Sequence, residues 1–292
     1  MTELSQISVI IPAYNEEIGL ATVLAALTQH SALQSAEIIV VDDGSKDKTA
    51  EVAARNPKVQ ITRREINMGY GASISRGIRL ATRPYVIWFD GDNQHRVEDL
   101  ILVAQTLIAQ DLDYCIGVRT GDSYQEPSRW LGKLVLRWAV NYAVGSSVAD
   151  FNSGLRGFRR SVILKYLNFL PKGFGASTVT TLLMLERDHV GAEVPIVVHA
   201  RQGRSQVKQL RDGSRTLLII LRIFLLFKPL RFFGGIGAAL ILLGLVYGLY
   251  RAFAEGLGFP TLGLLSIVAG LQSFFFGLLA DQISMARLDN LD

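Results

Sequence analysis

Two aspartates separated by one glycine are the strongest chemical signal in this chain of 292 residues. Asp90, Gly91 and Asp92 follow an apolar stretch, Tyr85–Phe89, that has the composition of a β-strand, and an amide, Gln94, comes two residues later. The glycine lets the backbone turn sharply between the two acids. Carboxylate and amide oxygens suit Mg²⁺ or Mn²⁺ and leave coordination positions open for phosphate oxygens. The alternative is a polar turn that only caps a helix.

A second pair of acids, Asp42 and Asp43, ends another predicted strand. The glycine after them signals a turn, and Ser45 or Asp47 would cap the helix that follows. Capping does not explain two adjacent acids at a strand end. Carboxylates in such a place would accept hydrogen bonds from a uracil or guanine edge, or from ribose hydroxyls. The pair is therefore a candidate nucleotide site.

A glycine-rich segment, Asn67–Gly77, follows the third predicted strand but fits neither of two common phosphate-binding motifs. The third glycine of the dinucleotide fingerprint would fall at Ile74, and a GK[ST] phosphate loop occurs nowhere in the chain. Hydride transfer and P-loop chemistry are therefore not expected.

The elements that must position these residues alternate along the first 120 residues. Predicted strands cover Ile7–Ile11, Glu37–Val41, Val59–Ile61, Tyr85–Phe89 and Tyr114–Val118. Predicted helices cover Glu16–His30, Thr49–Arg55, Gly71–Thr82 and Val97–Ala109. Alternation of this kind with strands rich in Val and Ile favours a parallel α/β sheet. Ligands of such sheets bind beyond the carboxyl ends of the strands, where the acids lie.

The composition adds a membrane-sized apolar segment. Hydrophobic residues make up 49% and charged residues 19%, which excludes disorder, and a single cysteine excludes an internal disulfide or a cysteine zinc site. Phe232–Tyr250 and Gly256–Ala280 carry no charge, and a membrane-spanning helix needs about 20 apolar residues. With the polar turn at Arg251–Gly256 they predict a hairpin of two spans, and buried core helices are the alternative.

The flanking charges predict an orientation and a domain plan. Residues 201–231 hold eight Lys or Arg and one acid, Asp212, which places this flank in the cytosol. The N-terminus lacks the basic region of a signal peptide. Residues 214–228 mix basic and apolar side chains, as a helix lying in the membrane interface does, although a helix packed on the soluble domain would also fit. The plan is a cytosolic domain at 1–211, an interfacial helix at 212–229, spans at 230–282 and a cytosolic tail at 283–292.

Six motifs in order carry a family resemblance over nearly the whole chain. They read VIIPAYNEE, VVDDGSKDKT, NMGYGASISRGI, WFDGDNQH, DFNSGLRGFRR and EVPI, and are followed by RQGRSQ and the hairpin. The sequence resembles the family 2 glycosyltransferases of the GT-A fold, in the polyprenyl-phosphate branch that is similar to dolichol-phosphate mannose synthase. The resemblance implies a mixed, mostly parallel sheet with flanking helices. It also implies a UDP- or GDP-linked sugar donor, a polyprenyl phosphate acceptor such as undecaprenyl or dolichyl phosphate, and Mg²⁺ or Mn²⁺.

The resemblance also assigns residues. The metal and donor-diphosphate motif corresponds to Asp90, Asp92 and Gln94. The nucleotide pocket corresponds to Pro12, Tyr14, Glu16 and Asp43, with Asp42 beside them. The acceptor-phosphate positions correspond to Ser153 and Arg156, and the loop over the active site to Arg201 and Ser205. That loop ends in Gln206 where the family pattern has lysine. Asp92, Arg156 and Arg201 are the expected catalytic residues.

The implied reaction needs positioning more than proton transfer. A phosphate monoester is largely dianionic near neutral pH, because its second pKa is about 6. Direct attack by this phosphate on the sugar would invert the anomeric carbon without a general base. Two alternatives stay open: transfer to a glycolipid or soluble hydroxyl, which requires a base, and a non-catalytic membrane partner. Glycines in the first span would allow association with a second copy, and no nucleic-acid partner is expected.

Overall fold

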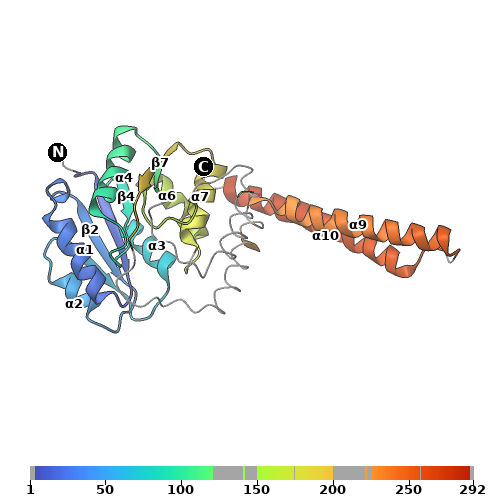
Figure 1. Cartoon of the computed structure of the whole chain (residues 1–292), viewed down its shortest axis with the longest axis horizontal. Helices are drawn as coiled ribbons and strands as arrows, with labels where there is room; N and C mark the ends of the chain where they lie inside the picture. The colour runs from blue at the N-terminus through green and yellow to red at the C-terminus, as the bar shows by residue number, and fades with distance from the viewer. Residues whose placement is uncertain are drawn as a thin grey trace. The chain divides into compact units, whose positions relative to one another are not determined.

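The computed structural model describes residues 4–120, 141, 150–173, 175–199, 221–222, 225, 227–256 and 258–289 (Figure 1). These residues belong to two compact units. One is a sheet domain that contains residues 4–120 and 150–199, and the other contains the two long C-terminal helices. Most of the predicted interfacial helix at 212–229 lies outside the described residues.

A seven-stranded sheet forms the centre of the first unit, in the order β3-β2-β1-β4-β6-β5-β7. All neighbouring strands pair in parallel except β6, which runs antiparallel to both β4 and β5. The strands are β1 Ile7–Ala13, β2 Glu37–Asp42, β3 Val59–Arg63, β4 Tyr85–Trp88, β5 Tyr114–Arg119, β6 Arg156–Arg159 and β7 Gly191–Ile196. The expected mixed, mostly parallel sheet is confirmed, and the five predicted strands are present.

Helices cover both faces of the sheet (Figure 1). They are α1 Glu17–Gln29, α2 Thr49–Ala54, α3 Tyr70–Leu80, α4 Val97–Ala109, α6 Arg160–Tyr166 and α7 Ala176–Glu186, with short 3₁₀ turns at Ser31–Leu33 and Leu167–Phe169. Alternate side chains of β1 point to opposite faces, as strand geometry requires. Val9 and Ile11 join one core with α1 and α4, whereas Ile10 packs against Gly77 of α3. Burial of both faces explains the near-continuous apolar strands.

Strand register brings the chemically interesting segments to one edge. Ala13 at the end of β1 pairs with Asp42 at the end of β2, and Ile10 pairs with Trp88 at the end of β4. Because β6 is antiparallel, its first residue, Arg156, pairs with Trp88. The segment that precedes β6 therefore joins the carboxyl ends of the parallel strands.

Four elements of this unit were not predicted from the sequence. Strand β6 is four residues long and begins and ends with arginine, so it lacks the Val and Ile pattern used to find the others. Helix α7 is buried from Ala176 to Met184, and a helix buried all round shows no amphipathic period. Helix α6 and strand β7 are similarly short and mixed in composition.

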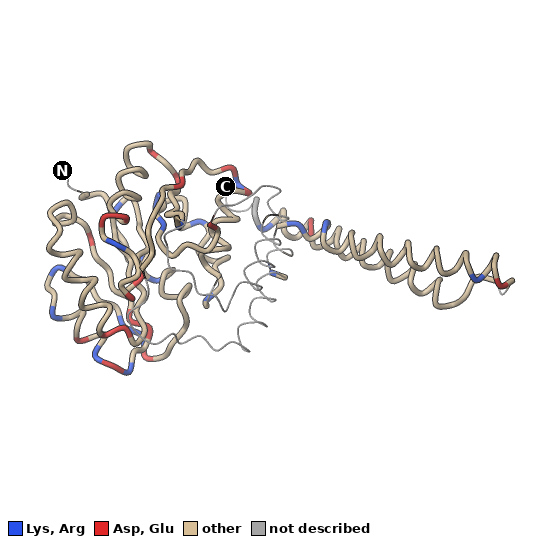
Figure 2. The backbone as a smooth tube through the Cα atoms, viewed as in Figure 1, with Lys and Arg blue, Asp and Glu red and all other residues tan. Residues whose placement is uncertain are grey.

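The second unit is the expected hairpin of long apolar helices. Helix α9 covers Pro229–Ala254 and α10 covers Thr261–Asp289. Both are long and apolar enough to cross a membrane, with mean hydropathies of 2.1 and 2.0 over their most apolar stretches. Figure 2 shows few charged residues along the hairpin except near its ends. Helix α10 differs from the domain plan, because it continues through 283–289 where a separate tail was expected.

Glycines hold the two helices close together. A Cβ on Gly237 would lie 2.6 Å from the carbonyl oxygen of Gly270, and one on Gly244 would lie 2.7 Å from that of Gly263. The hydroxyl of Ser273 donates to the carbonyl oxygen of Phe233 at 2.9 Å. Gly237 and Gly244 belong to the glycines of the first span that were expected to allow association with a second copy, and both pack inside the hairpin.

Candidate active site

Asp90 follows β4 and lies among groups from three separate segments. Its Oδ1 accepts a hydrogen bond from the hydroxyl of Tyr70 at 3.0 Å, and its Oδ2 lies 3.8 Å from Nε2 of His95. Gly154 packs against the same carboxylate, since a Cβ at this position would lie 2.3 Å from Oδ2. The predicted acceptor segment therefore contacts the predicted metal motif directly.

Asp92 has the electrostatic signature of a cation site. Burial, together with the negative charge of Asp90, raises the pKa of Asp92 to about 7. A divalent cation between the two carboxylates would remove this repulsion, so the residues fit Mg²⁺ or Mn²⁺. Among the described residues, no group of three or more His, Cys, Asp or Glu side chains could hold a metal ion. A metal held here therefore needs further ligands, such as diphosphate oxygens.

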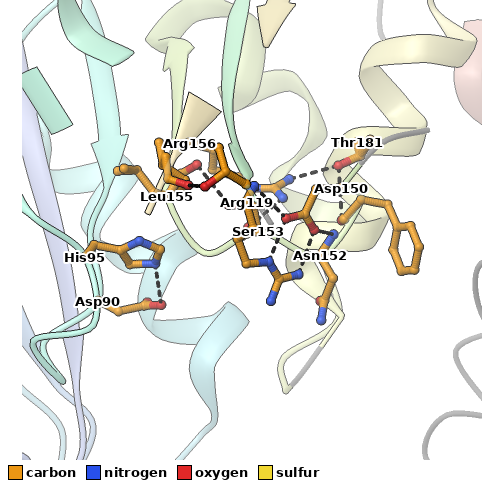
Figure 3. Close-up of polar contacts among 12 residues, drawn as sticks. Asp90, His95, Arg119, Asp150, Asn152, Ser153, Leu155, Arg156 and Thr181 are labelled. Carbon is orange, nitrogen blue, oxygen red and sulfur yellow. Dashed lines mark hydrogen bonds and ion pairs between the residues drawn. The ribbon is translucent and has the colours of Figure 1, made fainter. Parts of the chain in front are cut away.

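His95 is buried beside Asp90. Burial lowers the pKa of the ring below its ordinary value, and nearby Asp90 opposes the shift without reversing it. Figure 3 shows the ring facing Asp90, with the segment from Asp150 to Arg156 beside it. His95 is the last residue of the WFDGDNQH motif, and its burial excludes a solvated loop position for the ring.

Gln94 makes a contact that the sequence did not suggest. Its side-chain Nε2 donates to the backbone carbonyl oxygen of His199 at 3.1 Å. In turn, the backbone carbonyl oxygen of Gln94 accepts from the backbone N–H of His199 at 2.9 Å. The acidic loop is thereby joined to the segment after β7. The metal role of Gln94 stays a prediction.

The segments that follow β1 and β2, which are the predicted nucleotide loops, are joined by side-chain to backbone hydrogen bonds. The N–H of Asn15 donates to Ser45 Oγ and that of Glu16 to Thr49 Oγ1, both at 2.9 Å. In return, the N–H of Lys46 donates to Asn15 Oδ1 at 2.8 Å. Ser45 thus serves the start of α1 rather than capping α2. The bonds set the segment containing Pro12, Tyr14 and Glu16 beside the end of β2, and these three residues are half-buried.

The acids at the end of β2 already have partners within the protein. Asp43 accepts from the N–H groups of Met68 and Gly69, at 3.1 and 2.6 Å, and from Arg64 at 3.3 Å. Asp42 is fully buried, accepts from the N–H of Ser45 at 2.9 Å and lies 3.1 Å from Nε of Arg63. Both carboxylates therefore organise these loops, and contact with a nucleotide stays a prediction for them.

Arg156 differs most from its expected position. The side chain is fully buried, and its guanidinium centre lies 5.7 Å from the centre of the Trp88 ring. It donates to the carbonyl oxygens of Ser153 and Ser177, at 2.6 and 2.7 Å, and to two threonine hydroxyls of α7. Burial lowers its pKa to about 10, which leaves it charged. The guanidinium is buried and bonded to protein acceptors, so it holds this segment in place, and a contact with the acceptor phosphate stays a prediction.

The other predicted acceptor and loop residues divide into two groups. Ser153 is buried, and its carbonyl accepts from Arg156 (Figure 3). It is adjacent to Gly154, so the structure does bring it close to the acidic motif. Arg201, Ser205 and Gln206 lie outside the described residues.

Two residues at this edge were missed by the sequence analysis. Tyr70 begins α3, and only its place after the third strand could have pointed to it. Arg119 ends β5 and forms a two-pronged ion pair with Asp150, both contacts being 2.7 Å (Figure 3). Its position at the end of a predicted strand is the sequence signal that points to it. The guanidinium of Arg119 remains partly exposed.

Comparison with known proteins gives two family matches in one chain. The model of Glycosyl transferase family 2 matches residues 8–167, and that of the GtrB C-terminal hairpin matches residues 228–286. The first match covers more than half of the chain and contains the Asp90 motif, the nucleotide loops and β6. The second covers α9 and nearly all of α10.

Similar proteins extend over most of the chain. The uncharacterized protein MJ1222 of Methanocaldococcus jannaschii is 30% identical over 75% of this chain and 93% of its own. The undecaprenyl-phosphate 4-deoxy-4-formamido-L-arabinose transferase of Photorhabdus laumondii is 29% identical over 96% of this chain and 89% of its own.

A solved structure confirms the GT-A fold of the sheet domain. Glucosyl-3-phosphoglycerate synthase from Mycobacterium tuberculosis, in complex with Mn²⁺, uridine diphosphate and glucosyl-3-phosphoglycerate, superimposes with a TM-score of 0.59. The two chains are 21% identical, and the match covers 75% of this chain and 78% of the other. The same synthase has also been crystallised with Mg²⁺ and uridine diphosphate.

The contact between Gly154 and Asp90 generates one prediction. In Gly154→Ala, the new Cβ would displace Oδ2 of Asp90, and the carboxylate would rotate away from Asp92. We expect about ten-fold weaker Mn²⁺ binding in the presence of uridine diphosphate, measured by calorimetry, with little change in melting temperature. Gly173→Ala, where a Cβ meets nothing within 4 Å, is the control. Unchanged Mn²⁺ affinity in Gly154→Ala would mean that the packing does not constrain Asp90.

The burial of Arg156 generates a second prediction. Arg156→Lys keeps the charge but cannot reach all of the present acceptors, so a buried charged network is broken. We expect the free energy of unfolding to fall by about 3 kcal/mol, measured by denaturant titration of the full chain in detergent. Arg160→Lys removes partly exposed contacts to Ile78 and Arg79 and should cost far less. Equal stability of the two variants would contradict the structural role.

Proposed function

Because the chain belongs to glycosyl transferase family 2, we propose that it transfers a sugar from a nucleotide-sugar donor to a polyprenyl phosphate at the cytosolic face of a membrane. One observation carries the proposal: an acidic donor site on a GT-A sheet and a membrane-length hairpin occur in one chain. A relative similar over 96% of this chain is named as an undecaprenyl-phosphate sugar transferase, which supports the lipid acceptor.

Asp90 and Asp92 would hold the divalent metal, with Gln94 as a further oxygen ligand. The metal, Mg²⁺ or Mn²⁺, would stabilise the charge that develops on the nucleoside diphosphate as it leaves. The edge formed by β1 and β2 would take the nucleotide, through Pro12, Tyr14 and Glu16 and with Asp42 and Asp43 shaping the loops. A UDP or GDP donor fits these polar groups, and Arg201 would contact the diphosphate.

The acceptor would meet the donor where Gly154 packs against Asp90. A lipid phosphate arrives as an anion, so the protein orients it and does not have to deprotonate it. Ser153 and Ser205 would contact the phosphate, whereas Arg156 would act through its hold on the Ser153 carbonyl. Attack from the face opposite the diphosphate would invert the anomeric carbon.

The hairpin would anchor this reaction at the bilayer, because α9 and α10 each exceed the thickness of its hydrocarbon core. Eight Lys or Arg between residues 201 and 231 favour placing the sheet domain and both termini in the cytosol. Association of the hairpin with a second copy belongs to the same proposal and would use the surfaces that α9 and α10 leave exposed.

The acceptor can be tested by measuring nucleoside diphosphate release. We expect the full chain with Mn²⁺ and a panel of UDP- and GDP-sugars to release diphosphate from one donor only when a short polyprenyl phosphate is present. Asp92→Asn should lower this rate at least about 100-fold, because charge stabilisation at the leaving group is lost. Asp111→Asn, a surface acid paired with Arg159, should leave the rate unchanged.

Three results would contradict this proposal, each at a different point. Full turnover in excess chelator would show that the reaction does not require a divalent metal. Release that requires a hydroxyl acceptor, and not the lipid phosphate, would favour the glycolipid or soluble-acceptor alternative. No release with any donor, from protein that binds the nucleotide, would favour a non-catalytic partner.

The orientation has its own test. Ala254 and Lys46 are both exposed, so each position can be replaced by a single cysteine for labelling. The native Cys115 is buried. In intact cells, a membrane-impermeant maleimide should label the cysteine at 254, in the turn of the hairpin, and not the one at 46 in the sheet domain. Labelling at 46 alone would reverse the orientation and place the donor site outside the cell.

A further inference from the structure

Tyr70 contacts the metal motif from a segment that no sequence motif assigns to metal binding. It is the first residue of α3, in the glycine-rich stretch Asn67–Gly77. Its hydroxyl lies 3.0 Å from Oδ1 of Asp90 and donates a hydrogen bond to it. A tyrosine hydroxyl is charge-neutral at pH 7, so this contact orients the carboxylate without cancelling its charge.

The remaining surroundings of Asp90 limit the rotation of its carboxylate by packing on one side but donate no hydrogen bond to it among the described residues. On the Oδ2 side, Gly154 contributes only packing, and Nε2 of His95 is 3.8 Å away, beyond hydrogen-bond distance. Among the described residues, the Tyr70 hydroxyl therefore makes the one hydrogen bond to this carboxylate. Repulsion from Asp92 would otherwise favour rotation away from the shared cation site.

Tyr70 is itself held by the loop around it. Gly69, with φ of 98°, turns the chain just before it. The carboxylate of Asp43 accepts from the N–H of Gly69, and the N–H groups of Gly71 and Ala72 donate to carbonyl oxygens of residues 173 and 172. The N–H groups of Gly69, Gly71 and Ala72 at the start of α3 therefore all donate to acceptors within the protein. A continuous set of contacts leads from Asp43, at the predicted nucleotide edge, through Tyr70 to Asp90.

We propose that Tyr70 is a positioning residue that holds the Asp90 carboxylate in the orientation required to bind the divalent metal. The inference rests on the proposed function, since it assumes a metal between Asp90 and Asp92. In this proposal Tyr70 acts through Asp90, the side chain to which its hydroxyl donates. Partners of this kind set the geometry of a metal ligand, and their loss typically lowers metal affinity about 10- to 100-fold.

Tyr70→Phe tests the proposal, because it removes one oxygen atom and keeps the ring. The chain offers a matched control in Tyr85→Phe, since the Tyr85 hydroxyl also donates to an aspartate, Asp111, at 3.0 Å, away from the site. Mn²⁺ binding to the full chain with uridine diphosphate would be measured by electron paramagnetic resonance, and nucleoside diphosphate release as a function of Mn²⁺ concentration. Melting temperatures would be recorded for wild type and both variants.

We expect Mn²⁺ affinity to fall at least about ten-fold in Tyr70→Phe and to stay at the wild-type value in Tyr85→Phe. Release by Tyr70→Phe should return to the wild-type rate at saturating Mn²⁺, a rescue that a folding defect does not give. Wild-type Mn²⁺ affinity in Tyr70→Phe would overturn the proposal and leave the proposed function intact. A melting temperature far below that of Tyr85→Phe would make the role structural and also overturn it. Failure of wild type to bind Mn²⁺ would overturn both.

Discussion

The packing of Gly154 against the Asp90 carboxylate is the contact on which the arrangement of the site depends, and it follows from the direction of β6. Because β6 runs antiparallel between β4 and β5, its first residue, Arg156, lies opposite Trp88 at the carboxyl edge. The preceding segment must then pass beside Asp90. A parallel strand in the same place would begin at the opposite edge of the sheet. The predicted acceptor residues would then lie a strand's length from the acids.

The charges near this contact are handled in two different ways. Arg156 is buried and has no ion-pair partner among the described residues, and carbonyl and hydroxyl oxygens accept from its donors while the Trp88 ring faces it. Arg119 is paired with Asp150. Neither arginine forms an ion pair with Asp90 within the described part of the chain. Burial first, and the negative charge of Asp90 second, raise the pKa of Asp92, and two neighbouring carboxylates of this kind suit a divalent cation.

The hairpin depends on a different constraint, since apolar burial gives little drive for helices to associate within lipid. In this hairpin, van der Waals contact between closely spaced backbones takes the place of apolar burial. Gly237 faces the backbone of Gly270 and Gly244 faces that of Gly263, so the two helices approach closely at these levels, and Ser273 adds one hydrogen bond across them. Gly237 and Gly244 are packed in this way and are not available for association with a second copy, whereas Gly235 has nothing within 4 Å of the position that a Cβ would take.

The sequence by itself determined the five regular strands, the four helices between them, the two apolar helices and the acidic motif at the end of β4. These are local properties, because apolar periodicity, turn residues and uncharged length are each readable within one segment. The sequence did not reveal β6 or α7, nor that Arg156 is buried, nor that Tyr70 and Gly154 contact Asp90. Each of these depends on pairing between segments far apart in the chain. An arginine that binds a phosphate and one that holds a carbonyl have the same local sequence, and only the tertiary structure decides which acceptors lie within reach of its donors.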